Sequence, residues 1–361
     1  MSTDPVTFVL PGDVDDVTLA SGGNTYDRRM CDVLGPELRA VTLPGRWPTP
    51  DSAARYALDG ALGNAPDGSV ALVDGLVACG VPDVVVPHTS RLRLAILLHL
   101  PLADETGLPA DRAAELDVKE RETVRAVSAV IATSDWAGRR ITAHHGLSPS
   151  RVHVVAPGTD PAPLAAGSAG SRLLCLASVT PRKGQDVLAV ALGGVLDLPW
   201  TCACVGSVRR DPGYVDRVRG LIARHGLDER MSLAGPLPDD ELETTWAGTD
   251  LLVLPSYGET YGMVVTEALA RGVPVLTTDV DALPDTLGSN PDGAVPGILV
   301  PPGNAAALTD ALRRYLDRPT LRDRLRAAAR ERRGRLDDWD TAAKRLAGVL
   351  ARLGGEPSWA A

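Results

Sequence analysis

Short apolar runs rich in Val, Leu and Ile alternate with amphipathic stretches along nearly the whole chain. A buried parallel strand forms a continuous apolar run because helices cover both faces of such a sheet. The first half contains strand-like runs at residues 6–12, 69–76, 83–88, 94–100, 129–134 and 152–158. The second half contains further runs at residues 172–179, 200–207, 231–237, 250–256, 274–280 and 297–303. This alternation predicts an α/β protein with parallel sheets.

A stretch of Pro, Ala, Gly and Ser at residues 161–171 has no periodicity and interrupts the alternation, so we interpret it as a linker. The sequence therefore predicts two Rossmann-like, doubly wound domains that face each other across a cleft. We expect them at residues 1–165 and 166–335, with a last helix in 336–361 that packs back toward the first domain. Ligands of such sheets bind at the carboxyl ends of the strands.

The composition limits the class of partner and the compartment. The net charge is −9, with 37 basic and 46 acidic residues, and no basic run suggests a nucleic-acid partner. The five cysteines are scattered in apolar segments, which favours buried thiols in a reducing compartment over disulfides. The N-terminus resembles no signal peptide, and no apolar run reaches the roughly 18 residues of a membrane span. We therefore expect a cytoplasmic protein without an integral membrane segment. Peripheral membrane contact has no support in the sequence, although a lipid acceptor stays open.

The stretch PSYGETYGMVVTEALARGVP, residues 255–274, suggests a ligand site. A strand precedes it, and a helix is predicted to begin at Gly262 or Met263, where free amide groups and the helix dipole favour an anion. Glu259 could accept hydrogen bonds from neutral hydroxyl groups beside that anion. Glu267, roughly 7 Å further along the helix axis, could bind a second set of hydroxyls. This pattern fits a sugar nucleotide, whereas two solvated surface charges are the alternative.

The sequence lacks both G-x-G-x-x-G and G-x-x-x-x-G-K-S/T. Their absence argues against a dinucleotide-dependent dehydrogenase and a P-loop ATPase.

GETYGMVVTEALARGVPVL resembles the E-x7-E signature of glycosyltransferase family 4, whose members are retaining enzymes with the GT-B fold. The resemblance extends over nearly the whole chain and is densest from about residue 172 to residue 312. It implies that Glu259 orients the donor sugar and that Glu267 holds the ribose. Thr260, Tyr261, Gly262 and Met263 would form the donor-binding helix entrance.

ASVTPRKGQDVL, residues 177–188, resembles the turn with which the family grips the diphosphate. Lys183 matches the family's lysine and would neutralise the leaving group. Ser178 stands where the family usually has arginine. Arg182 is either a compensating phosphate ligand or a solvated flanking residue.

The first domain resembles the family more weakly. Gly22 and Gly23 match its glycine-rich loop and would bring the backbone close to the diphosphate, and Asn24 could cap the following helix. His99 ends a strand where the family has a histidine near the donor sugar. Ser134 is predicted to be a helix N-cap.

The resemblance implies a retaining transfer of a sugar from a nucleoside-diphosphate donor to an acceptor hydroxyl, with catalytic roles for Glu259, Lys183 and His99. It implies no metal or other cofactor, so we interpret the three Asp-x-Asp pairs, at residues 13/15, 279/281 and 338/340, as turn or cap residues. Two alternatives remain, a nucleotide-sugar epimerase on the same scaffold and a sugar-nucleotide-binding protein without catalysis.

Overall fold

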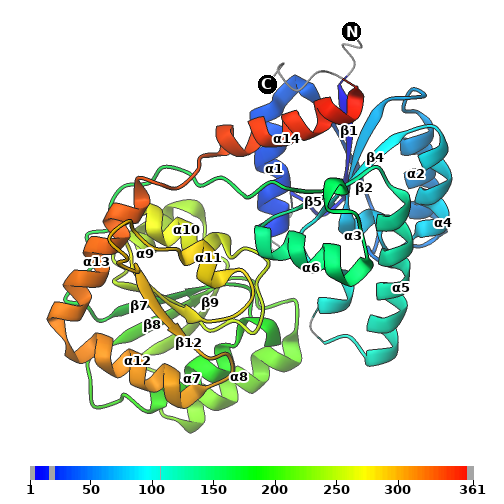
Figure 1. Ribbon diagram of the computed structural model, residues 1–361. Helices are drawn as coiled ribbons and strands as arrows, with labels where there is room; N and C mark the ends of the chain where they lie inside the picture. The colour runs from blue at the N-terminus through cyan, green and yellow to red at the C-terminus, as the bar shows by residue number, and fades with distance from the viewer. Residues whose placement is uncertain (1–4, 16–20, 106, 356–361) are drawn as a thin grey trace. The chain divides into compact units, whose positions relative to one another are not determined.

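The computed structural model describes residues 5–15, 21–105 and 107–355. The chain forms two compact units: one contains Gly22–Gly158 with the N-terminal strand and the C-terminal helix, and the other contains Thr159–Asp337. Each unit has a six-stranded parallel sheet (Figure 1). The predicted α/β class with two Rossmann-like sheets is confirmed.

In the first unit the strand order is β2-β1-β3-β4-β5-β6. The strands are β1 (Val6–Pro11), β2 (Leu38–Leu43), β3 (Val70–Asp74), β4 (Arg93–Leu98), β5 (Ala129–Ala132) and β6 (Val152–Val154). The helices are α1 (Gly22–Leu34), α2 (Ser52–Gly63), α3 (Gly75–Ala78), α4 (Pro82–Val85), α5 (Ala110–Ala126), α6 (Asp135–His145) and α14 (Trp339–Gly354). Helix α14 packs on α1 and contacts β3 and β4, whereas α2 to α6 contribute to a core on the opposite face.

In the second unit the order is β12-β11-β10-β7-β8-β9. The strands are β7 (Arg172–Leu176), β8 (Thr201–Val205), β9 (Met231–Gly235), β10 (Leu251–Leu254), β11 (Val275–Thr278) and β12 (Gly297–Val300). The helices are α7 (Gln185–Gly193), α8 (Pro212–Arg224), α9 (Asp239–Ala247), α10 (Met263–Ala270), α11 (Leu283–Leu287), α12 (Ala305–Asp317) and α13 (Pro319–Arg333). Read as β9-β8-β7-β10-β11-β12, this is the strand order of doubly wound dinucleotide-binding folds.

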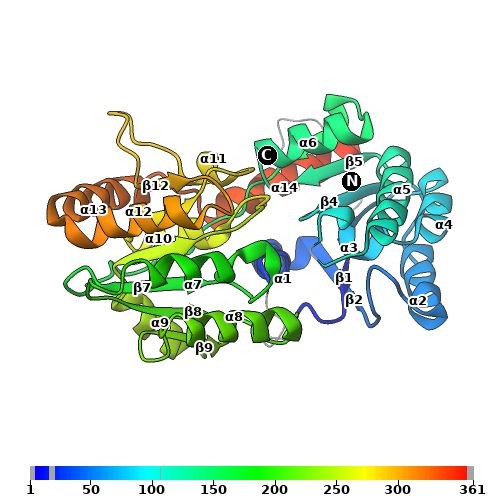
Figure 2. The same cartoon turned by 90° about the horizontal axis from the view of Figure 1, so that it is seen from below.

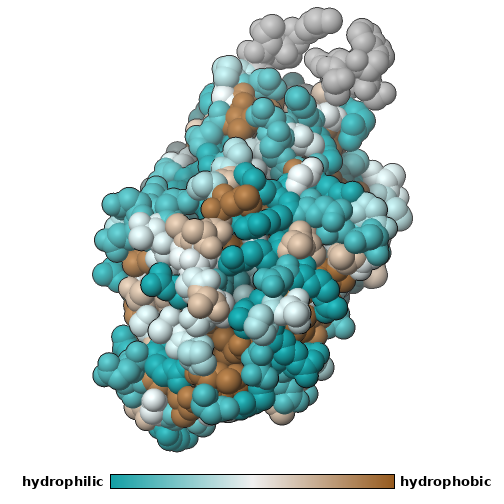
Figure 3. Space-filling model, turned by 90° about the vertical axis from the view of Figure 1, so that its left-hand side faces the viewer, coloured by the Kyte–Doolittle hydropathy of each residue, from teal (hydrophilic) through white to brown (hydrophobic). Residues whose placement is uncertain are grey.

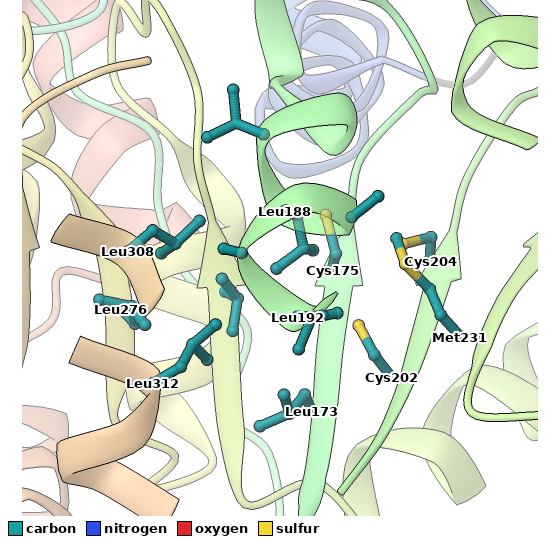
Figure 4. Packing of buried hydrophobic residues seen from close by; sticks show 14 of the residues in the cluster. Leu173, Cys175, Leu188, Leu192, Cys202, Cys204, Met231, Leu276, Leu308 and Leu312 are labelled. Carbon is teal, nitrogen blue, oxygen red and sulfur yellow. The ribbon is translucent and has the colours of Figure 1, made fainter. Parts of the chain in front are cut away.

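Helices cover both faces of each sheet, as Figure 2 shows from a second direction. In the second unit, side chains of α7, α8 and α12 form one core. Leu188 and Leu192 lie beside Leu173 and Cys175 of β7, and Leu312 lies on the side of Leu276 (Figure 4). Helices α10 and α11 contribute to a separate core on the other face. Aliphatic side chains make up most of both cores, with Trp200, Tyr214 and Tyr315 in the first and Trp246 in the second.

The strand predicted at residues 83–88 is wrong. Pro82 begins the short helix α4, and a 3-10 helix continues over Val86–Ser90. Proline at a first helical position favours helix, and a short apolar run does not distinguish a strand from a buried helical segment.

The cysteine prediction is partly wrong. All five thiols are free, but Cys31 is half-buried whereas the other four are buried. On the face drawn in Figure 3, hydrophilic residues predominate and apolar residues form small separate groups. Within the described residues, no helix combines the length and apolar character that crossing a membrane requires.

Candidate active site

The sheet of the second unit reverses its strand order between β7 and β10, which are hydrogen-bonded neighbours. Ligands of open α/β sheets bind beside the carboxyl ends of strands at such a switch point. The loops that follow these two strands carry Lys183 and Glu259 respectively. The fold therefore brings together two residues that are 76 positions apart in sequence.

The turn after β7 packs closely against the loop after β10. Residues Pro181–Lys183 form a 3-10 turn, and Gly184 follows with φ of +68°. A Cβ atom at Gly184 would lie 2.2 Å from the carbonyl oxygen of Pro255, so only glycine fits there. The amide of Tyr257 donates to the carbonyl oxygen of Arg182 at 2.7 Å. These contacts fix the backbone of the turn that carries Lys183.

Glu259 lies in what we call the Glu259 cluster, formed by Glu259, Lys183, Arg182 and Ser256. Only 6% of Glu259 is exposed, which rules out the reading of this residue as a solvated surface charge. Its Oε1 accepts hydrogen bonds from Lys183 Nζ and from Ser256 Oγ, the latter at 2.9 Å. Arg182 lies 3.5 Å from Oε2. The backbone amide of Glu259 donates to Asp281 at 3.1 Å, which fixes the loop.

The charges of this cluster oppose the effect of burial on Glu259. Burial alone would raise the pKa of Glu259, but the two cations and the two side-chain hydrogen bonds lower it below its usual value. Burial, together with repulsion from Arg182, lowers the pKa of Lys183 despite its pairing with Glu259. The cluster thus holds an ionised carboxylate and a desolvated ammonium group.

Helix α10 begins directly after this loop. Its N-cap residue Gly262 has φ of +87°, and no side chain caps the helix. A Cβ atom at Gly262 would lie 2.8 Å from Leu283 Cδ2. Thr286 Oγ1 donates to the carbonyl oxygen of Tyr261 at 2.6 Å, which holds the approach to the helix. An N-terminus without a side-chain cap retains amide donors for an anion. Thr260, Tyr261 and Met263 are half-buried around it.

Glu267 lies within α10, and its side chain is half-buried. Burial raises its pKa, with added repulsion from Asp160 and Glu243, whereas Arg271 lowers it. Arg271 itself forms an ion pair with Glu243. Burial thus determines the direction of the shift at Glu267, whereas the neighbouring cations outweigh burial at Glu259.

Ser178, which stands at the family's arginine position, is half-buried. Its carbonyl oxygen accepts a hydrogen bond from Gln185 Nε2 at 3.0 Å. Arg182 donates to the carbonyl oxygen of Gly258 at 2.9 Å, and its buried Nε has no hydrogen-bond partner within the described part of the chain. Arg182 is therefore anchored in the cluster rather than solvated.

The first unit has its own group of titratable residues, which we call the His99 cluster: the buried Asp27 and Asp74 and the half-buried His99. His99 follows β4 at the strand end, as predicted. Its Nε2 lies 2.8 Å from Asp27 Oδ1 and 3.5 Å from Asp74 Oδ2. Asp74 ends β3, and α1, which carries Asp27, follows β1 in the sequence. The order of this sheet reverses between these two strands, so the cluster also lies at a switch point.

The two aspartates of the His99 cluster did not emerge from the sequence. Asp74 ends the apolar run VALVD, and a carboxyl group at a strand end indicates a site residue only weakly. The only feature of the sequence near Asp27 that suggests a site is the glycine pair that precedes it. Burial and repulsion from Asp27 raise the pKa of Asp74 to about 7. Burial alone would lower the pKa of His99, but attraction to both aspartates raises it.

Gly22 and Gly23 begin α1, and a Cβ atom at Gly23 would lie 3.1 Å from the His99 ring. The predicted capping role of Asn24 is wrong, because α1 begins two residues earlier and the Asn24 side chain donates to the carbonyl oxygen of Asp13 at 3.3 Å. The beginning of the predicted glycine-rich loop, residues 19 and 20, lies outside the described residues. Ser134 does cap α6, since its side chain accepts from the amide of Ala137.

Of the Asp-x-Asp pairs, Asp338 accepts from the amide of Thr341 and caps α14, and Asp281 accepts from the amide of Glu259. Asp338 is therefore the cap residue that the sequence predicts, whereas the side chain of Asp281 holds the loop that carries Glu259.

Comparison with known proteins agrees with this geometry. A family model for glycosyl transferases group 1 matches residues 161–332, which include the Glu259 cluster. A D-inositol 3-phosphate glycosyltransferase of Streptosporangium roseum is 30% identical over 348 residues, covering 90% of this chain and 74% of the relative. The chain belongs to glycosyltransferase family 4. A protein of the same name from Streptomyces bingchenggensis is 30% identical over 295 residues, covering 75% of this family 4 chain and 61% of the relative. The chain thus spans about three fifths of the length of several relatives.

Solved structures share the fold of the family 4 chain. A sucrose-phosphate synthase from Thermosynechococcus elongatus has a TM-score of 0.79 at 19% identity, over 97% of this chain and 99% of its own. Anabaena HepE, solved with UDP and glucose, has a TM-score of 0.73 at 18% identity, over 95% of this chain and 99% of its own.

Proposed function

We propose that this chain is a retaining glycosyltransferase that moves a sugar from a nucleoside-diphosphate donor to an acceptor hydroxyl. The observation that carries the proposal is the Glu259 cluster. A buried carboxylate, a desolvated lysine and a helix N-terminus without a side-chain cap converge at the switch point of one sheet. This arrangement supplies an acceptor for sugar hydroxyls next to donors for a diphosphate.

Each group has a distinct role in the proposed reaction. Lys183 and Arg182 bind the diphosphate and stabilise the charge that develops on it as the glycosidic bond breaks. The amides of Tyr261, Gly262 and Met263 contribute to the same oxyanions. Glu259 exchanges its contact with Lys183 for hydrogen bonds from sugar hydroxyls.

The remaining site residues bind the two ends of the donor. Glu267 accepts hydrogen bonds from the ribose, and the raised pKa of its carboxyl suits a hydroxyl better than a phosphate. His99 contacts the donor sugar. The leaving phosphate accepts the proton of the acceptor hydroxyl, so the reaction needs neither an enzymic nucleophile nor a metal ion.

The first substrates to test follow from the relatives. Anabaena HepE was solved with UDP and glucose, which favours a UDP-sugar donor. Curated relatives are named D-inositol 3-phosphate glycosyltransferases, which makes an inositol phosphate the first acceptor to test. We also propose that residues 1–165 bind the acceptor, that residues 166–335 bind the donor, and that the protein works in the cytoplasm, where five free thiols stay reduced.

The test is transfer by the Glu259→Gln variant, which keeps the shape of the side chain but removes its charge. We expect kcat to fall by about a hundredfold or more, because a neutral amide accepts hydrogen bonds from the sugar hydroxyls less strongly than a carboxylate and pairs less strongly with Lys183. Glu115→Gln, which removes the exposed partner of Lys119, is the matched control and should transfer normally. Near-normal turnover of Glu259→Gln would overturn the assigned role.

The same assay separates the alternatives. An NMR time course of wild-type protein should show a product with the anomeric configuration of the donor, with or without a chelator. An epimerase would convert the donor in the absence of an acceptor. A binding protein would gain thermal stability from the donor without transferring or hydrolysing it.

A further inference from the structure

A second group of titratable residues lies in the first unit, between helices α5 and α6 and outside the His99 cluster. Asp117 of α5 and the adjacent His144 and His145 of α6 each place one potential metal-ligand atom within 4.8 Å of the other two. Asp117 and the imidazole of His144 are in direct contact. Two imidazole nitrogens and one carboxylate oxygen are a donor set that suits Zn²⁺.

His145 is the member of this group whose environment is incomplete. The residue is fully buried, and its Nε2 lies 2.8 Å from Glu120 Oε1. The other oxygen of Glu120 accepts the amide of Leu102 at 2.8 Å. His145 Nδ1 is buried and has no hydrogen-bond partner within the described residues. Both a neutral and a protonated ring therefore leave a buried polar atom unsatisfied, which is costly.

A cation at Nδ1 would remove this defect. Glu120 holds the proton on Nε2, so the Nδ1 lone pair is the one available to a metal. Ligating histidines commonly donate their second ring N–H group to a carboxylate, which fixes the tautomer and strengthens the ligand. Glu120 already lies in that position relative to His145. Asp117 and Glu120 place two carboxylates beside the two imidazoles, and Arg121 pairs with one oxygen of Asp117.

The surroundings allow entry and hold the ligands in place. The His144 side chain is 48% exposed and that of Asp117 is 20% exposed, so an ion can reach the group from solvent. Arg121 donates a hydrogen bond to Oδ2 of Asp117 at 2.9 Å, so Oδ1 of Asp117 is the oxygen that contacts His144. Arg125 donates to the carbonyl oxygen of His145, at the end of α6. Arg121 therefore holds Asp117 through its second carboxylate oxygen, and Arg125 holds His145 through its backbone carbonyl group.

We propose that Asp117, His144 and His145 bind one Zn²⁺ ion, with Glu120 as the residue that positions His145. The ion enters between Asp117 and His144, takes Nδ1 of His145 as its buried ligand, and links α5 to α6. This site is separate from the Glu259 cluster and does not depend on the proposed transfer reaction.

The test measures binding of Zn²⁺ alone to the full chain, by equilibrium dialysis with metal analysis and by thermal unfolding. The key variants are His144→Ala and Asp117→Asn, because both side chains reach the surface and their loss should spare the fold. His88→Ala is the matched control, since His88 pairs with Asp59 at 2.9 Å and belongs to no group of three potential ligands among the described residues. His99→Ala controls for the other histidine-containing group of potential ligands.

We expect wild type, His88→Ala and His99→Ala to bind Zn²⁺ at this site and to gain thermal stability from it. His144→Ala and Asp117→Asn should bind at least about tenfold more weakly and lose that gain. Glu120→Gln should weaken binding by about 10- to 100-fold while keeping all three ligands. Equal binding by wild type and His144→Ala would overturn the proposal, as would the absence of Zn²⁺ binding by wild type. Loss in His99→Ala with retention in His144→Ala would assign the ion to the His99 cluster instead.

Discussion

The Glu259 cluster and the His99 cluster differ in their ratio of acids to bases. The carboxylates of both clusters are buried, and each cluster lies at the switch point of its own sheet. The Glu259 cluster holds one carboxylate and two cationic side chains, whereas the His99 cluster holds two carboxylates and one imidazole. The pKa of Glu259 is consequently lowered, and that of Asp74 is raised to about 7.

This difference shows that burial alone does not set the protonation state of a carboxyl group. Desolvation raises the pKa of both carboxyls, and the number of neighbouring cations decides the net direction. An excess of cations suits a site for a diphosphate, whose negative charge would then balance the cluster. An excess of acids suits a site that retains a proton near neutral pH.

Replacing Lys183, the principal cation of the Glu259 cluster, should have the largest effect on the difference between the two clusters. In Lys183→Met the carboxylate of Glu259 keeps only Arg182, at 3.5 Å, and Ser256. We expect the free energy of unfolding to fall by about 3 kcal/mol, because a buried charge loses its main partner. We expect kcat for transfer to fall about a hundredfold as well.

Urea unfolding and steady-state kinetics measure the two effects of Lys183→Met. Lys119→Met is the control, since Lys119 pairs with Glu115 on the exposed surface and such pairs contribute little. Unchanged stability of Lys183→Met would mean that Arg182 alone balances Glu259.

The pH dependence of stability should reveal the excess of carboxyl groups in the His99 cluster. The folded-state pKa of Asp74, about 7, exceeds its ordinary value of 3.8, so the folded state binds more protons between these values. Stability therefore falls as pH rises from about 4 to about 7, with a slope of at most about 1.4 kcal/mol per pH unit from this group. The raised pKa of His99 acts in the same direction, since its stabilising contribution is lost as pH rises through the folded-state value.

Asp74→Asn isolates the contribution of this carboxyl. Asparagine can still accept the amide of Leu76, which Asp74 accepts at 2.7 Å. We expect a flatter stability profile between pH 4 and 7, measured by urea unfolding at several pH values. Asp59→Asn, on the exposed partner of His88, should leave the profile unchanged. A profile of Asp74→Asn as steep as that of wild type would show that Asp74 is already ionised at low pH.

The same two clusters show what the sequence could and could not predict. The Glu259 loop, its glycines and α10 are contiguous, and the motif that contains them carries a local signal of a strand, a turn and a helix start. Lys183 is a predicted site residue because its turn resembles the turn with which the family binds the diphosphate. Both were therefore predicted, together with the parallel sheets on which they lie.

The His99 cluster is different because long-range strand order creates it. Asp27, Asp74 and His99 come from three separate segments, and only the arrangement of β1, β3 and β4 brings them within hydrogen-bond range. The contact of Lys183 with Glu259 was also beyond the sequence, since no local pattern specifies a pairing across 76 positions. The predicted capping role of Asn24 is wrong for a local reason, because a glycine pair gives little indication of where a helix begins.

Replacing Arg182 should have the smallest effect of these changes, and it tests whether the Glu259 cluster needs two cations to bind the donor. Its Nε is buried without a hydrogen-bond partner in the described chain, which suits a ligand oxygen, whereas Ser178 contributes a carbonyl oxygen to Gln185. If Arg182 compensates for the serine at the family's arginine position, Arg182→Gln should weaken donor binding by about tenfold, equivalent to about 1.4 kcal/mol. Stability should change by less than about 1 kcal/mol, because Lys183 still pairs with Glu259.

Ser178→Ala is the matched variant for this comparison, and we expect it to change the donor Kd by less than about threefold, since the loss of one neutral hydroxyl costs little. Calorimetric titration with UDP and with the UDP-sugar measures both variants. The reverse order, with Ser178→Ala the weaker binder, would assign the phosphate contact to Ser178 and leave Arg182 as a residue that holds the Gly258 loop. The Glu259 cluster would then contain one functional cation instead of two, and its contrast with the His99 cluster would depend on Lys183 alone.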